Sequence, residues 1–161
     1  MSDAVTMDAD AYLDEYVDPT VVEFGEEPAS RRRAFIACVV VFHTVDYLAM
    51  RPGSPNSQNL RNRLREKNSS FAIVERAAHA FKHGEAGDEN APVNKPLRVE
   101  DVISRPAMRV GGGGGQAGIS QVGDGVGGVQ IWKERGRPDL LFVVREAVAF
   151  LRLQTAKPDN A

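Results

Sequence analysis

Apolar residues recur with helical spacing in three parts of the chain. The run AFIACVVVFHTVDYLAM (34–50) is apolar nearly all round, which is typical of a helix in the middle of a bundle. We expect this helix to begin near Pro28–Ser30 and to run to about Met50, because Pro52 and Gly53 follow. LLFVVREAVAFLRL (140–153) predicts a terminal helix with Pro138 at its first position and Asp139 in its first turn.

Two further helices are expected between these. SQNLRNRLREK (57–67) has a narrow apolar stripe of Leu60 and Leu64, and its other faces are charged. Residues 68–70 should break or cap the chain, and FAIVERAAHAFKH (71–83) should then form a helix that ends at Gly84. Near the N-terminus, tyrosines and aliphatic residues at 12–17 predict one short helix that ends before Pro19.

The pattern changes after Gly84. Residues 85–96 have the composition of a loop, and LRVEDVIS (97–104), AGISQV (117–122) and GVQIWKE (128–134) have the length and β-branched content of strands. The sequence therefore predicts a mainly α (α+β) protein: a three- to four-helix bundle with a small antiparallel β hairpin or sheet inserted before the C-terminal helix. We divide one domain, 1–161, into an acidic N-terminal segment (1–28), a helical core (29–83), a loop and β insert with glycine-rich tips (84–137) and a C-terminal helix (138–155).

Composition is ordinary for a soluble globular protein, with 42% hydrophobic and 26% charged residues and a net charge of −2. Charge is unevenly distributed, because residues 1–30 hold nine acidic and no basic residues, whereas 31–67 hold eight basic and two acidic ones. We expect the acidic segment to fold back onto the basic one; a binding arm is the alternative. The lone Cys38 should be a core residue, and a cytoplasmic location is expected because a reducing compartment suits a chain without disulfides.

Neither a membrane nor a cofactor is expected. The apolar run 34–50 is shorter than the roughly 20 residues that a span needs, and His43 and Asp46 interrupt it. The start of the chain is acidic and lacks the charged-then-apolar pattern of a secretory signal. GDGVGG (123–128) matches a dinucleotide-binding glycine pattern, but a strand follows it where a helix would be needed, so it predicts a hairpin turn. The pentaglycine at 111–115 predicts a loop.

Basic side chains alternate with other residues between 61 and 67, and they could contact phosphates. Positions two apart are separated by about 200° around a helix, so Arg61, Arg63, Arg65 and Lys67 do not form one dense face. We therefore favour a solvated helix surface for these residues.

The helix 71–83 carries the candidate chemistry. Arg76, His79 and His83 are spaced one turn apart and form a line about 10 Å long on the side away from the apolar face. A stripe of this kind can simply face water, and the helix dipole favours His83 at the C-terminal end. His43 and Asp46 lie on one side of an otherwise apolar helix and need polar partners if they are buried. We therefore predict that they face the line of Arg76, His79 and His83.

Arg76 and His83, separated by six residues, satisfy the R-x4–6-H pattern, and the chain thereby resembles HEPN-type helical proteins. Many of these are metal-independent ribonucleases of toxin and defence systems. The resemblance implies that Arg76 holds the scissile phosphate and that His83 transfers a proton at the 2′-hydroxyl, in a cleft shared by two protomers of a homodimer. The commonest form of the pattern has a polar residue after the arginine, and this chain has Ala77.

Two other chemistries fit the same residues. His79 and His83 have metal-ligand spacing, and Asp46 or His43 could complete three ligands, although the glutamate of an H-E-x-x-H motif is absent. The cluster could also be a structural polar network that fixes the packing of two helices.

Most of the chain resembles a group of small uncharacterised bacterial proteins. They share a phenylalanine-histidine-x-x-aspartate helix, matched here by Phe42, His43 and Asp46, and an alanine-histidine-x-x-lysine-histidine helix, matched by residues 78–83. The resemblance implies the helical architecture and points to the same polar residues, but it implies no activity.

The specific hypothesis is a HEPN-like metal-independent endoribonuclease or RNA-binding protein. His83 would transfer the proton, Arg76 would contact the phosphate, and His79, His43 and Asp46 would support them. RNA and a second copy of the chain are the expected partners, and no cofactor is expected. The alternative is a non-catalytic helical interaction protein in which the cluster is structural.

Overall fold

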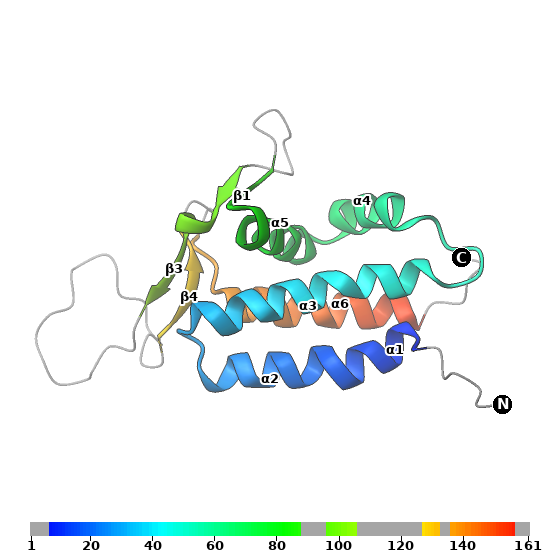
Figure 1. Ribbon diagram of the computed structural model, residues 1–161, viewed down its shortest axis with the longest axis horizontal. Helices are drawn as coiled ribbons and strands as arrows, with labels where there is room; N and C mark the ends of the chain where they lie inside the picture. Colours follow the sequence, from blue (N-terminus) through cyan, green and yellow to red (C-terminus); the bar gives the residue numbers. More distant parts are fainter. Residues whose placement is uncertain (1–6, 88–95, 106–126, 133–135, 157–161) are drawn as a thin grey trace, which may run out of the picture.

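A computed structural model describes residues 7–87, 96–105, 127–132 and 136–156 (Figure 1). The first helical arm combines α1 (Ala9–Tyr12), the π-helix η1 (Leu13–Val17) and α2 (Asp18–Glu26). The predicted stop before Pro19 is wrong, because the helix continues through it. Proline cannot donate the backbone hydrogen bond to residue 15, and the wider π-helical turn just before it accommodates the ring.

The central helix α3 (Arg31–Ala49) begins and ends as predicted. The Ser30 hydroxyl accepts a hydrogen bond from the amide of Arg33 at 3.3 Å, which satisfies one of the unpaired donors of the first turn. Gly53, with a φ of 80°, turns the chain after the helix. α3 contacts the arm, the later helices α5 (Ser69–His83) and α6 (Leu140–Thr155), and the strand β3 (Val102–Arg105), so the prediction of a central position is confirmed.

The helices α4 (Ser57–Lys67) and α5 (Ser69–His83) meet at the single residue Asn68. Its extended backbone ends α4, and its side chain accepts a hydrogen bond from the amide of Phe71 at 2.7 Å and so caps α5. Gly84 follows α5 with a φ of 83°, as the sequence predicts. This one-residue corner sets α4 against the side of α5, which forms the site described below.

The C-terminal helix α6 (Leu140–Thr155) also has a side-chain cap. The Asp139 carboxylate accepts from the amide of Phe142 at 3.2 Å, so Asp139 precedes the helix and Pro138 lies one residue further out. The helix therefore begins two residues later than predicted. Asp139 in this position still stabilises the start of the helix through its charge.

Two small antiparallel sheets lie between α5 and α6 in the chain, which confirms the mainly α fold with a β insert. β1 (Glu85–Ala86) pairs with β2 (Leu97–Arg98), and β3 (Val102–Arg105) pairs with β4 (Gly128–Ile131) after the short helix η2 (Val99–Asp101). β1 occupies residues that were expected to be loop. Gly128 opens β4, so a strand follows the glycine pattern as predicted. Residues 123–126 of that pattern, the pentaglycine and AGISQV lie outside the described residues.

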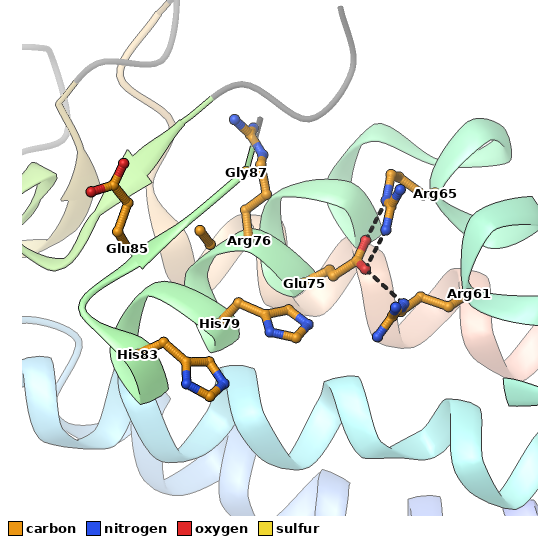
Figure 2. A pocket seen from close by; sticks show the side chains of 9 residues that line it. Arg61, Arg65, Glu75, Arg76, His79, His83, Glu85 and Gly87 are labelled. Carbon is orange, nitrogen blue, oxygen red and sulfur yellow. Dashed lines mark hydrogen bonds and ion pairs between the residues drawn. The ribbon is translucent and has the colours of Figure 1, made fainter. Parts of the chain in front are cut away.

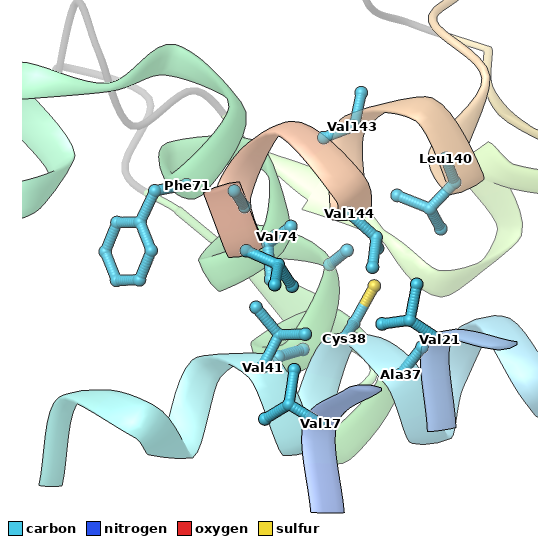
Figure 3. Packing of buried hydrophobic residues seen from close by; sticks show 14 of the residues in the cluster. Val17, Val21, Ala37, Cys38, Val41, Phe71, Val74, Leu140, Val143 and Val144 are labelled. Carbon is cyan, nitrogen blue, oxygen red and sulfur yellow. The ribbon is translucent and has the colours of Figure 1, made fainter. Parts of the chain in front are cut away.

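One hydrophobic core joins the arm, α3, α5 and α6 (Figure 3). Cys38 lies at its centre, and burial raises the pKa of its thiol far above the ordinary value, as expected of a small core residue. The labelled members come from the arm, α3, α5 and α6: Val17, Val21, Ala37, Cys38, Val41, Phe71, Val74, Leu140, Val143 and Val144. Each fully buried valine or leucine contributes about 1.5–3 kcal/mol of transfer free energy.

The acidic arm packs on α3, as the charge distribution predicts. Arg33 pairs with Glu26 and Glu27 at 3.2 and 3.0 Å, and Arg51 pairs with Asp10 at 3.6 Å. Exposed pairs of this kind each contribute little to stability, so they fix where the arm lies more than how tightly it is held. No helix within the described residues combines the length and the hydropathy that crossing a membrane requires.

Candidate functional site

The predicted line of Arg76, His79 and His83 on α5 lies along one wall of a cavity of about 330 Å³ (Figure 2). The three side chains differ in burial. Arg76 is only 5% exposed, His79 is partly buried and His83 is exposed. Glu85 and Ala86 of β1 and Gly87 directly after it also line the cavity, and the Arg76 side chain extends toward Gly87. The line therefore runs from a buried guanidinium to an exposed imidazole within one cavity.

The second wall of the cavity comes from α4. Arg61 and Arg65 are one helical turn apart and both contact Glu75, whose side chain is only 3% exposed. Arg65 donates Nε and Nη2 to the two oxygens of the Glu75 carboxylate, both at 2.6 Å, which is the bidentate geometry of a strong ion pair. Arg61 Nε lies 3.1 Å from the same carboxylate, as an ion pair rather than a hydrogen bond.

The prediction of a solvated surface is therefore wrong for Arg61 and Arg65. Their side chains are 23% and 21% exposed, and both face α5 rather than solvent. Arg61 and Arg65 share a face because they are four residues apart, although residues two apart do not share one. Arg63, between them, is exposed as predicted.

Positive charge outweighs negative charge among the described lining residues, with three arginines against Glu75 and Glu85. Glu85 also pairs with Arg98 of β2 at 3.3 Å, which reduces its negative effect on the cavity. The ion pair with Glu75 raises the pKa of Arg65, so this cation keeps its proton at every working pH. The cavity can therefore attract an anion.

His79 of α5 is half-buried and packs against α3. The edge-to-face contact with Phe42 of α3 has ring centroids 5.1 Å apart, and His83 stacks on the other side at 6.0 Å. Burial lowers the pKa of His79 from 6.5, and Arg61, His83 and Lys82 lower it further, while Glu75 acts in the opposite direction. His79 is therefore a neutral imidazole near pH 7, able to accept a proton.

His43 and Asp46 do not line this cavity, so the prediction that they share its site is wrong. The two side chains are 45% and 49% exposed, and His43 Nδ1 lies 2.9 Å from Asp46 Oδ2. The prediction assumed that both would be buried on a central helix, but this edge of α3 is open to solvent. The two side chains therefore pair with each other.

The histidine metal site is also not supported by the geometry. Within the ranges that the structure describes, no three side chains of histidine, cysteine, aspartate or glutamate lie close enough together to hold a metal ion. The rings of His79 and His83 stack on each other, and the Asp46 carboxylate pairs with His43. We therefore discard this alternative for the described residues.

Sequence reasoning missed Glu75, which organises the site. The residue stands immediately before Arg76 and one turn before His79, so a carboxylate on a helix with an otherwise basic line was a visible signal. The pairing of Arg61 and Arg65 at a four-residue spacing was a second signal. Neither indicates on its own that α4 and α5 pack side by side.

No protein-family model, no curated protein and no solved structure matches this chain. The chemistry of the cavity between α4 and α5 therefore carries the functional argument by itself.

Proposed function

We propose that the cavity between α4 and α5 binds the phosphate backbone of RNA and that the protein is a HEPN-like, metal-independent endoribonuclease. One observation carries this proposal: Arg76 and His83, the two residues of the R-x4–6-H pattern, line the same cavity. The cavity adds His79, Arg61 and Arg65, which are the residue types that phosphate binding and proton transfer require. His43 and Asp46 have no part in the reaction, since they lie outside the cavity.

The reaction follows from the two histidines. The resemblance implies that His83 acts at the 2′-hydroxyl, but the neutral imidazole of the cavity is His79, so in this proposal His79 accepts the proton of the 2′-hydroxyl while that oxygen attacks the adjacent phosphorus. The bond from phosphorus to the 5′-oxygen breaks, and His83 donates a proton to this leaving oxygen. The products are a 2′,3′-cyclic phosphate and a 5′-hydroxyl, and no metal takes part. The ring centroids of His79 and His83 are 6.0 Å apart, which allows both to reach one phosphate group.

Arginine charge favours the transition state over the bound substrate. A phosphodiester carries one negative charge, and the phosphorane formed by the attack carries two. Arg76 contacts the non-bridging oxygens, and the excess of arginine over glutamate in the lining stabilises the added charge. A buried guanidinium such as Arg76 has a stronger effect than a solvated one because water screens it less.

The HEPN resemblance supplies the setting of the proposal. It implies a protein of a toxin or defence system that acts as a homodimer, with the active cleft shared between protomers. The bacterial origin and the cytoplasmic location are separate expectations from the sequence, which fit this setting. His83 is exposed at the mouth of the cavity, where RNA or a second protomer can reach it.

A second candidate function is favoured by Glu75. This buried carboxylate already engages Arg65 with both oxygens and contacts Arg61, so the cluster can act as a structural network that fixes α4 against α5. The protein would then be a non-catalytic helical interaction protein.

The test is cleavage of labelled RNAs by the purified protein with and without EDTA, using two matched histidine variants. His83→Ala removes the exposed imidazole of the cavity, and His43→Ala removes a partly exposed imidazole outside it. We expect cleavage that survives EDTA, is retained in His43→Ala and is lost in His83→Ala. If the folded protein neither cleaves nor binds varied RNAs, the proposal is contradicted, and the structural network remains as the role of the cluster.

A further inference from the structure

Glu75 is the most deeply buried carboxylate among the described residues of the site, and its carboxylate pairs with two cations of α4. Its two oxygens accept both parallel N–H groups of Arg65, at 2.6 Å each, and Oε1 also lies 3.1 Å from Arg61 (Figure 2). A carboxylate that is 3% exposed on a capped helix has little freedom to move. Its position therefore determines where the two guanidinium groups lie.

Without a carboxylate at this place, Arg61 and Arg65 would repel each other. Their side chains follow one another by a single turn on α4, and each is less than a quarter exposed. Two partly buried cations at this distance would rotate toward solvent and leave the wall of the cavity. Glu75 holds them at the wall.

The same residue also faces the histidines. Glu75 precedes His79 by one turn of α5, so the two side chains lie on the same side of the helix, and Figure 2 shows them side by side. The other charged groups that act on His79 are Lys82 and His83 from its own helix and Arg61 from α4. From α3, the neighbour of His79 is the uncharged ring of Phe42.

We propose that Glu75 is the positioning residue of this cavity: it fixes the Arg61 and Arg65 guanidinium groups for an anionic ligand, and its charge acts on His79 one turn away. The inference rests on the proposed function only in naming the ligand as a phosphate. Glu75 touches neither substrate nor reacting atoms in this account. It acts through the groups that do.

The first experiment follows the ring protons of His79 by NMR as the pH is changed, in the full-length protein without RNA. Glu75→Gln keeps the shape and removes the charge, so the pKa of His79 should fall, because Glu75 raises it. Glu85→Gln is the matched control, since Glu85 lines the same cavity but does not act on His79. An unchanged pKa of His79 in Glu75→Gln would overturn the inference.

If Glu75→Gln fails to fold, Arg61→Gln tests whether the charges that meet at Glu75 act on His79, here with the opposite sign. Glu75 keeps its bidentate partner Arg65 in this variant, and removal of the Arg61 charge should raise the pKa of His79. A pKa of His79 that does not rise would overturn the electrostatic part of the inference.

The second experiment separates position from charge. Arg65→Lys keeps the positive charge but removes the planar guanidinium that bonds to both oxygens of Glu75. It should weaken binding of inorganic phosphate about tenfold, the equivalent of one charge-assisted hydrogen bond. Arg63→Lys on the exposed side of α4 is the control and should bind phosphate like the wild type. Equal affinity of Arg65→Lys and the wild type would overturn the positioning role.

Neither experiment depends on cleavage of RNA. If the His79 and phosphate results are as expected but no RNA is cleaved, the inference about Glu75 stands and the proposed ribonuclease function fails. If RNA is cleaved and both results are negative, the function stands and the inference fails.

Discussion

The ring of Phe42 on α3 contacts two histidines from different helices. Its centroid lies 5.1 Å from that of His79 on α5 and 5.7 Å from that of its own neighbour His43. The phenyl ring occupies the place where the sequence led us to expect a polar contact between His43 and the line on α5. Phe42 therefore belongs to the wall that buries His79, and it keeps the exposed pair of His43 and Asp46 apart from the cavity.

Phe42→Ala should raise the pKa of His79 toward its ordinary value of 6.5, because burial is the main cause of the lowered value. Phe42→Leu keeps most of the apolar volume and should leave the pKa of His79 low. Histidine NMR titration of both variants measures the difference. If the pKa of His79 stays low in Phe42→Ala, a part of the protein other than Phe42 causes the burial.

The lowered pKa of His79 makes the protein less stable in mild acid. In the unfolded chain this histidine binds a proton below about pH 6.5, whereas the folded protein resists protonation until a lower pH. The unfolded state then binds more protons, so the free energy of unfolding falls as the pH drops from 6.5 to the folded pKa. Urea unfolding at pH 7.5 and at pH 5 measures this loss. His79→Gln should show a smaller loss, and an equal loss in both proteins would contradict the assignment.

Most helix boundaries could be predicted from the sequence because the signals that set them are local. Ser30, Asn68 and Asp139 each cap a helix through a side chain that bonds to an amide three residues later. Gly84 takes the positive φ that ends α5. Signals of this kind depend only on neighbouring residues, so tertiary packing rarely overrides them.

The arm and the site show where local reasoning stops. Pro19 should end a helix by its own chemistry, but the π-helical turn before it removes the conflict, and no residue of the sequence indicates such a turn. The role of Glu75 depends on the packing of α4 beside α5, which the one-residue corner at Asn68 produces. The spacing of residues along a single helix contains no information about that second helix.

Arg65→Ala should destabilise the protein by about 2 kcal/mol, since it removes two charge-assisted hydrogen bonds from a buried carboxylate that keeps only Arg61 as a partner. Arg63→Ala should change the stability by less than about 0.5 kcal/mol, because Arg63 is exposed on the other side of α4. Chemical denaturation of the two variants gives the comparison. Similar losses in both would mean that the ion pair with Glu75 does not hold α4.

Tyr12 should make the protein sensitive to alkali. Burial raises the pKa of this phenol from 10.0 to about 12, and the hydroxyl donates to the carbonyl of Val40 at 3.0 Å. Between pH 10 and 12 the unfolded chain therefore loses the Tyr12 proton and the folded protein keeps it, so stability falls as the pH rises. Tyr12→Phe should cost about 1 kcal/mol at pH 8 through the lost hydrogen bond. The loss of stability in Tyr12→Phe relative to the wild type should be smaller at pH 11. If thermal unfolding shows the same loss at pH 8 and at pH 11, the raised pKa of Tyr12 is contradicted.

Gly128 and Asp139 connect the second sheet to the start of α6. A Cβ atom at position 128 would lie 2.3 Å from Oδ2 of Asp139, whose other oxygen accepts from the amide of Phe142 and caps the helix. Gly128→Ala should therefore displace the cap and lower the free energy of unfolding by about 1 kcal/mol or more. Asp139→Ala removes the cap and the clash together. In that background Gly128→Ala should cost much less, so a double-mutant cycle measured by denaturation should give a clear coupling between the two sites. Simple additivity of the two losses would show that Asp139 can cap α6 without the space that Gly128 leaves for it.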